Sequence, residues 1–234
     1  IGTKFWDRHK KYLYKFQGFT PNVVNPLDAS TDLMMDLLGN PNIESDFLRK
    51  GLVIGDVQSG KTATYTALIN KAADAGYKVI ILLTGTIEKL RQQTQGRLDE
   101  GFVGLDSTAL FYNKGNVSVG VGKIDNVDCW SLTSTSSDFN KSAAERLIGK
   151  LASINSPILF VLKKNKSVLT KLEQWIKIYN TNPTNKKCPL PMLLIDDEAD
   201  NASINVKLET PAAINACIRK LLNLFNKANY VGFT

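Results

Sequence analysis

From Gly51 onward, apolar runs of strand length alternate with segments whose apolar residues recur at helical spacing. Such alternation is typical of right-handed strand–helix–strand crossovers, which build a parallel sheet with helices on both faces. We therefore predict an α/β domain. The predicted strands are LVIG from Leu52, KVIILLTG from Lys78, PILFVLKK from Pro157, MLLID from Met192 and YVGFT from Tyr230, and the predicted helices lie at 62–76, 86–100, 142–155, 168–179 and from Thr210 onward.

The first 48 residues follow a different pattern. Aromatic residues are frequent, and TPNVVNPLDAS at 20–30 predicts a bend because Pro and Asn interrupt regular structure. TDLMMDLLG at 31–39 predicts a short helix closed by its glycine. We interpret residues 1–48 as a helical N-terminal appendage and residues 49–234 as one domain. Within that domain, residues 101–140 are rich in Gly, Ser, Asn and Asp and are interpreted as an insertion or an irregular strand region.

Composition narrows the class of protein. The chain is 43% hydrophobic and 22% charged, and no apolar run reaches the roughly 18 residues of a membrane span. The N-terminus has neither an initiator Met nor an apolar signal core, and three scattered cysteines lack metal-ligand spacing, so we expect a cytoplasmic protein. The single histidine, His9, lies in a basic segment and is expected at the surface. A net charge of +7 favours a polyanionic partner such as nucleic acid without establishing one.

The segment GDVQSGKT, residues 55–62, fits the spacing G-x-x-x-x-G-K-[ST] and lies between a predicted strand and a predicted helix. That context is the one a phosphate-binding loop requires, because glycines let backbone N–H groups surround phosphate oxygens and the helix start adds positive charge. The ammonium of Lys61 would contact the outer phosphates, and the hydroxyl of Thr62 would bind Mg²⁺. The predicted nucleotide-binding residues are Gly55, Asp56, Val57, Gln58, Ser59, Gly60, Lys61 and Thr62.

A second motif, IDDEAD, ends the apolar strand that begins at Met192. Ligands of open parallel sheets bind at the carboxyl ends of the strands, which is where these carboxylates would lie. We predict that Asp197 holds Mg²⁺ together with Thr62, and that Glu198 orients and polarises the attacking water. The predicted catalytic residues of ATP hydrolysis are therefore Lys61, Asp197 and Glu198, with ATP and Mg²⁺ as cofactors. No adenine-reading glutamine motif precedes the loop, so base preference stays open.

The pairing of GKT at 60–62 with DEAD at 197–200 resembles the motor core of superfamily-two helicases and translocases, which are P-loop NTPases with a recombinase-A-like fold. The resemblance is closer to the Z-one domain family, endonuclease-associated ATPases of bacterial restriction and phage-defence systems. It rests on GLVIGDVQSGKT, DAGYKVIILLTGTIEKLRQQTQGRL, LLIDDEADNASIN and YVGFT, and it spans residues 51–234. It implies an ATP-driven motor that acts on nucleic acid, with DNA as the expected partner. Nuclease activity is not carried over, because no second acidic cluster with a nearby lysine is seen.

In superfamily-two motors the segment after the second strand contacts the nucleic-acid backbone, and LTGTIEKLRQQTQ holds that position here. By this resemblance Thr84, Gly85, Thr86 and Arg91 are candidate phosphate ligands. Lys163 and Lys164, just past another predicted strand, and TSTSSDF at 133–139 are further candidates. The alternative is that Thr86 only caps its helix and that Arg91 is solvated.

Two functions follow from these motifs. The first is the ATP-binding motor domain of a DNA helicase or translocase in restriction or phage defence. The second is a nucleotide-regulated switch or scaffold that assembles protein partners without moving on nucleic acid.

Because the chain ends at Thr234, where the Ser/Thr-Ala-Thr type motif of such motors would begin, we expect a truncated C-terminal end and further domains in the same polypeptide. An arginine from a second motor domain can contribute about 10³-fold or more in rate, so slow hydrolysis by residues 1–234 alone is expected.

Overall fold

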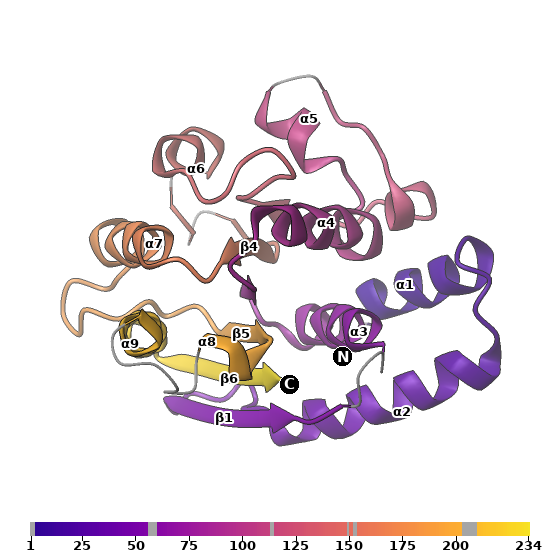
Figure 1. Cartoon of the computed structure of the whole chain (residues 1–234), viewed down its shortest axis with the longest axis horizontal. Coiled ribbons are helices and arrows are strands. Elements are labelled where there is room, and N and C mark those ends of the chain that lie inside the picture. The colour runs from indigo at the N-terminus through magenta and orange to yellow at the C-terminus, as the bar shows by residue number, and fades with distance from the viewer. Residues whose placement is uncertain (1–2, 56–59, 113–114, 149, 152–153, 203–209) are drawn as a thin grey trace.

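The computed structural model describes residues 3–55, 60–112, 115–148, 150–151, 154–202 and 210–234. Here six strands form one sheet in the order β1-β6-β5-β2-β4-β3, and every strand pair is parallel (Figure 1). This confirms the predicted α/β class. Within the described ranges, no helix has the length and apolarity needed to cross a membrane. The strands are β1 (Phe47–Val53), β2 (Val79–Thr84), β3 (Trp130–Ser131), β4 (Ile158–Lys163), β5 (Met192–Asp197) and β6 (Lys227–Phe233).

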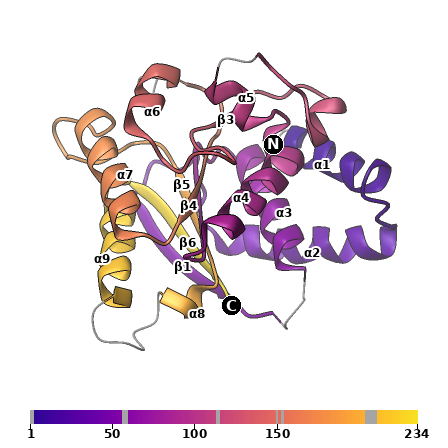
Figure 2. The same ribbon diagram turned by 45° about the horizontal axis from the view of Figure 1, so that its top comes forward.

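Helices cover both faces of the sheet, as Figures 1 and 2 show. On one face the side chains of α6, α7 and α9 pack around the fully buried Trp175. On the other face α3 contributes Leu68 and Ile69 to a second core. The central strands read as continuous apolar runs because both of their faces are buried. The helical elements are α1 (Lys4–Lys15), α2 (Pro21–Leu37), α3 (Lys61–Ala75), α4 (Glu88–Leu98), η1 (Asp99–Val103), α5 (Ser107–Phe111), η2 (Gly120–Lys123), α6 (Lys141–Ile148), α7 (Lys166–Tyr179), α8 (Ala199–Ala202) and α9 (Thr210–Asn223).

The two N-terminal helices pack on α3. The carboxylate of Asp74 on α3 accepts hydrogen bonds from the backbone N–H groups of Phe5 (2.9 Å) and Trp6 (2.8 Å), which caps the start of α1. Lys71 on α3 forms an ion pair with Asp28 on α2 at 2.6 Å. A third core cluster fills the space between these helices and consists of Trp6, Leu13, Val24, Leu27 and Ala67.

The bend predicted at 20–30 is wrong. Helix α2 begins at Pro21 and continues through Pro26 to Leu37. Pro21 suits the first helical position because the N–H that it lacks would have no partner there. Pro26 removes one helical hydrogen bond, and burial of Val24 and Leu27 against the neighbouring helices offsets that loss.

The surroundings of His9 also differ from the prediction. Its side chain is only 3% exposed and lies next to Gly101 instead of at the surface. Burial lowers the pKa of His9 to about 4, so the imidazole is neutral at pH 7. His9 is therefore a packing residue of α1.

The segment 101–140 consists mainly of helical turns and loops where it is described. Of the β-prone pieces, NVSVGVG forms an isolated bridge between Leu105 and Ser118 and then the turn η2. The piece VDCWSLTS supplies only β3, which extends the sheet by two residues beside β4. The described part of this segment thus adds one short edge strand to the sheet.

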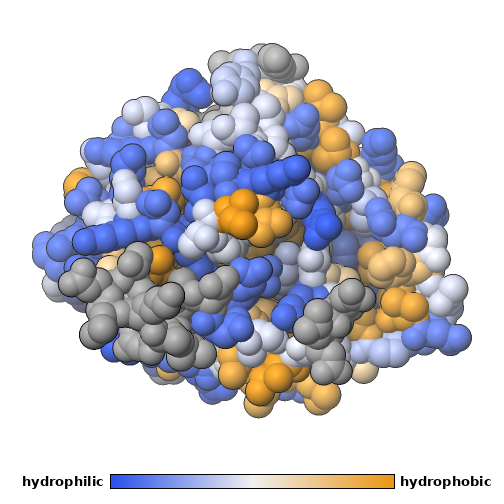
Figure 3. All heavy atoms as spheres, viewed as in Figure 1, coloured by the Kyte–Doolittle hydropathy of each residue, from blue (hydrophilic) through white to orange (hydrophobic). Residues whose placement is uncertain are grey.

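Strand β1 forms the opposite edge of the sheet and is largely exposed. Leu48, Leu52 and Ile54 all present apolar surface to solvent. In Figure 3 apolar side chains gather along the lower edge of the molecule, over β1, whereas most of the visible face is hydrophilic. Strand β1 thus leaves apolar side chains exposed along one edge of the sheet.

Candidate nucleotide site

The carboxyl ends of the strands place the end of β1 near the acidic motif at the end of β5. Asp197 on β5 is in register with Phe233 on β6, and Phe233 is in register with Val53 on β1. Beyond the strands, the Gly55 N–H donates to the carbonyl oxygen of Thr234 at 3.0 Å. The end of β1 and the acidic end of β5 are thus separated by one strand, or about 10 Å. This edge of a parallel sheet is where ligands bind.

The start of α3 is built around a glycine and two polar residues. Residues 56–59 of the predicted phosphate-binding loop lie outside the described residues. Gly60 has a φ of 72°, a left-handed conformation that favours glycine, and α3 begins directly after it at Lys61. The hydroxyl oxygen of Thr62 accepts hydrogen bonds from the hydroxyl of Tyr65 (3.2 Å) and from Nη1 of Arg97 (3.3 Å). The helix start thus carries a lysine and a hydroxyl that is already used as an acceptor.

Asp197 is electrostatically linked to the start of α3. Burial raises the pKa of the Asp197 carboxyl, the negative charge of Glu198 adds to the rise, and the positive charge of Lys61 opposes it. The pKa of Tyr65 is raised by burial and further by the charge of Asp197. The charge of Lys61 thus acts on Asp197, and the charge of Asp197 acts on Tyr65, across the carboxyl end of the sheet.

Glu198 has an unusual backbone conformation. Its φ is 57°, a left-handed value that is uncommon for residues other than glycine and that clusters at functional sites. The ammonium group of Lys164 donates to the carbonyl oxygen of Glu198 and helps to hold this conformation. A Cβ atom on Gly85 would lie only 2.8 Å from Oε2 of Glu198. The Glu198 carboxylate is therefore positioned against the backbone at the end of β2.

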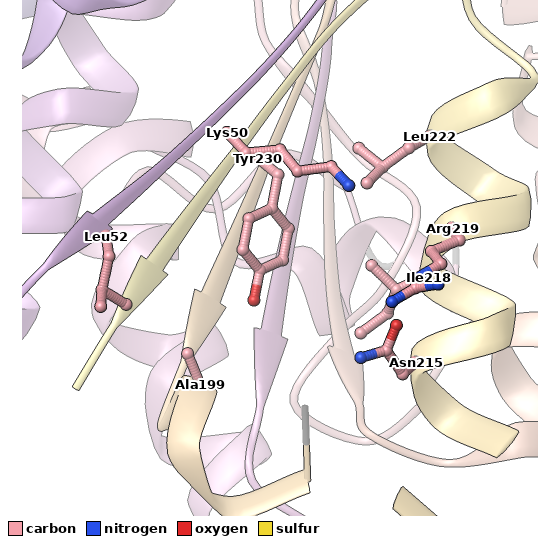
Figure 4. A pocket seen from close by; sticks show the side chains of 8 residues that line it. All are labelled: Lys50, Leu52, Ala199, Asn215, Ile218, Arg219, Leu222 and Tyr230. Carbon is pink, nitrogen blue, oxygen red and sulfur yellow. The ribbon is translucent and has the colours of Figure 1, made fainter. Parts of the chain in front are cut away.

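A buried ion pair supports this acidic loop. Lys164 and Asp196 are both 0% exposed, and their charged atoms are 2.6 Å apart. The hydroxyl of Tyr230 donates to the other Asp196 oxygen at 2.8 Å, so the buried carboxylate has partners on both oxygens. Tyr230 also lines a pocket between the sheet and α9, with Lys50 and Arg219 among its other lining residues (Figure 4). Lys164 is thus a structural residue and does not offer its ammonium group to nucleic acid.

The other residues expected to contact nucleic acid differ in exposure. Thr86 is exposed, and Lys163 is 25% exposed with its ammonium group 2.6 Å from a carboxylate oxygen of Glu88. Thr84 is buried, and its hydroxyl donates to a backbone carbonyl of β4. Gly85 is also buried, beneath Glu198. Of Thr84, Gly85, Thr86 and Lys163, Thr86 is thus exposed and Lys163 is partly exposed.

Arg91 is fully buried, so neither a phosphate contact nor a solvated side chain describes it. Its guanidinium donates to the backbone carbonyls of Ser134 (2.9 Å) and Thr135 (3.3 Å) and to the Glu88 carboxylate (2.8 Å). The guanidinium group of arginine is planar and carries five N–H donors, so it can hydrogen-bond to several carbonyl and carboxylate oxygens at once. Arg91 therefore holds the segment 133–139 against α4, and the sequence offered no signal that distinguishes this role from a surface role.

The contact between Gly85 and Glu198 gives a direct test of the site. If the site hydrolyses ATP as the motifs predict, Gly85→Ala should displace the Glu198 carboxylate and reduce turnover by about 10- to 100-fold, because small misplacements of catalytic groups are costly. Nucleotide affinity should stay unchanged. The matched control is Gly51→Ala on β1, where an added Cβ would meet nothing within 4 Å. Steady-state hydrolysis and nucleotide titration of both variants test this, and equal turnover in the two would contradict the assigned position of Glu198.

Comparison with known proteins assigns no family. No protein-family model matches the chain, and a search of curated proteins finds no significant match.

Among the described residues, no three His, Cys, Asp or Glu side chains form a metal cluster. Mg²⁺ bound with a nucleotide needs only one or two carboxylates beside phosphate oxygens and water, so the oxygen donors of Thr62 and Asp197 fit it. The candidate site is therefore defined by its own geometry.

Proposed function

We propose that this chain is the ATP-binding motor domain of a superfamily-two-like DNA helicase or translocase with a recombinase-A-like fold, related to the Z-one domain ATPases of restriction and phage defence. The observation that carries the proposal is the convergence of Lys61 and Thr62 with Asp197 and Glu198 at the carboxyl edge of a parallel sheet. This convergence supports ATP hydrolysis because it unites a phosphate-binding group, two oxygen donors for Mg²⁺ and a carboxylate for water.

Each residue has a definite role in this proposal. The Lys61 ammonium and the N–H groups at the start of α3 hold the phosphates. Thr62 and Asp197 would hold Mg²⁺, which would neutralise part of the phosphate charge. Glu198 accepts a hydrogen bond from the attacking water and aligns it with the terminal phosphate. Burial raises the pKa of Asp197 and the charge of Glu198 adds to the rise, and a bound divalent cation would oppose both effects.

Nucleic acid is the proposed partner of the same edge. Thr86 is exposed just after β2, Lys163 is partly exposed at the end of β4, and the whole chain has a net charge of +7. Gly85 precedes Thr86 in the chain and lies directly under the Glu198 carboxylate. A nucleic-acid phosphate bound at Thr86 would therefore lie one residue along the chain from the backbone that supports the proposed catalytic carboxylate. This short connection would couple nucleic-acid binding to hydrolysis.

The test is ATP hydrolysis by the intact protein with and without DNA or RNA. We expect DNA to stimulate hydrolysis, and the stimulation to fall steeply as salt rises, because phosphate contacts release counterions. If nucleic acid changes neither the rate nor the nucleotide affinity, the motor proposal fails and a nucleotide-regulated switch or scaffold is favoured.

A further inference from the structure

Arg97 on α4 reaches the candidate nucleotide site from the same side of the sheet as the phosphate-binding lysine. Helices α3 and α4 lie side by side on one face (Figures 1 and 2). Nη1 of Arg97 donates to the hydroxyl oxygen of Thr62 at 3.3 Å, and the Arg97 charge acts on Tyr65, opposing the burial-driven rise in the pKa of that tyrosine. Arg97 therefore places a cation next to the hydroxyl proposed to bind Mg²⁺.

The surroundings of Arg97 differ from those of the buried arginines. Arg91 is fully buried against a carboxylate and backbone carbonyls, and Arg8 is buried against the carbonyl of Phe102. Arg97 is exposed, and no carboxylate of the described residues lies within ion-pair distance of it. Its charge is thus not used to hold the fold together.

The helix that carries Arg97 is firmly anchored. Six residues before it, Arg91 fixes α4 to the segment 133–139. Two residues before it, the buried Gln95 donates to Asp99 (2.8 Å) and to Ser131 (3.1 Å). The Cα of Arg97 is therefore held in place, and only its flexible side chain is free to adjust near Thr62.

Electrostatics restricts what the Arg97 side chain does when the site is filled. A guanidinium and Mg²⁺ repel each other, so both remain near Thr62 only if anionic oxygens lie between them. Guanidinium groups bind phosphate oxygens through charge-assisted hydrogen bonds. We propose that Arg97 binds a phosphate oxygen of the nucleotide, from within the same domain, in addition to Lys61. The inference rests on the proposed function and adds a phosphate ligand that lies outside both sequence motifs.

The test is the affinity for a fluorescent ATP analogue with Mg²⁺ and with EDTA. We expect Arg97→Ala to weaken binding by about tenfold or more, the usual loss for one charged hydrogen bond. The loss should be larger in EDTA, where the side-chain cations alone oppose the phosphate charge. Arg97→Lys should recover part of the affinity. Lys89→Ala removes one positive charge from an exposed position on the same helix and should bind like the wild type.

The outcomes separate the two proposals. If the wild type binds no nucleotide, or if Lys61→Ala binds as tightly as the wild type, the nucleotide site itself is wrong. If Lys61→Ala loses binding while Arg97→Ala binds like the wild type in both buffers, the nucleotide site stands and the role of Arg97 is wrong. Thermal unfolding without nucleotide shows whether each variant is folded, and Arg97→Lys keeps the test valid if Arg97→Ala is destabilised.

Discussion

Replacing Lys61 with alanine is expected to lower the affinity for ATP by about 10- to 100-fold, because one charged hydrogen bond to phosphate is lost. Lys61 is the first residue of α3, the helix start proposed to hold the phosphates, and its charge acts on Asp197. Removing the ammonium group therefore takes away both a direct contact and part of the positive potential at the site. Titration with a fluorescent ATP analogue in the presence of Mg²⁺ measures the change.

Stability should hardly change in this variant. The side chain of Lys61 is only partly buried, and surface substitutions of this kind usually alter the free energy of unfolding by about 0.5 kcal/mol or less. ATP should raise the unfolding temperature of the wild type, since a ligand that binds only the folded state stabilises it. The same ATP concentration should have little effect on Lys61→Ala. An equal thermal shift in both proteins would show that nucleotide binds elsewhere.

Glu198→Gln is expected to retain ATP binding and to reduce turnover by about 10²- to 10⁴-fold, the range for loss of a general base. Gln has nearly the shape of Glu but does not accept a proton from water. The backbone of residue 198 should keep its left-handed conformation, because the Lys164 ammonium donates to its carbonyl oxygen, which the substitution leaves in place. Single-turnover hydrolysis with nucleic acid present, together with nucleotide titration, separates binding from chemistry.

The matched control for this variant is Asp200→Asn. Asp200 belongs to the same acidic motif but is exposed on α8, beyond the loop that Lys164 and Gly85 hold. It should hydrolyse ATP at close to the rate of the wild type. Normal turnover by Glu198→Gln would show that another group orients the water. Loss of nucleotide binding in Glu198→Gln would point instead to a role in holding the nucleotide.

Local sequence signals located most of the elements. Apolar runs predicted the strands of the central sheet, and Gly76 marked the end of α3, where it adopts the left-handed conformation typical of a helix C-terminus. The acidic motif was correctly placed at the end of β5. These signals are read within a few residues, so they need no knowledge of the rest of the fold. The predicted bend at 20–30 was wrong because burial of one face of α2 against neighbouring helices outweighed the hydrogen bond lost at Pro26.

The sequence by itself determined a parallel α/β fold and the candidate chemistry of two motifs. Only the tertiary structure decided that Arg91 and Lys164 are buried supports, that Gly85 lies under the Glu198 carboxylate, and that Arg97 reaches Thr62. The physical reason is the separation along the sequence of the residues that make these contacts. Strand and helix patterns arise from neighbouring residues, whereas these contacts join residues from 32 to 113 positions apart. They exist only once the strand order β1-β6-β5-β2-β4-β3 has set which carboxyl ends are adjacent.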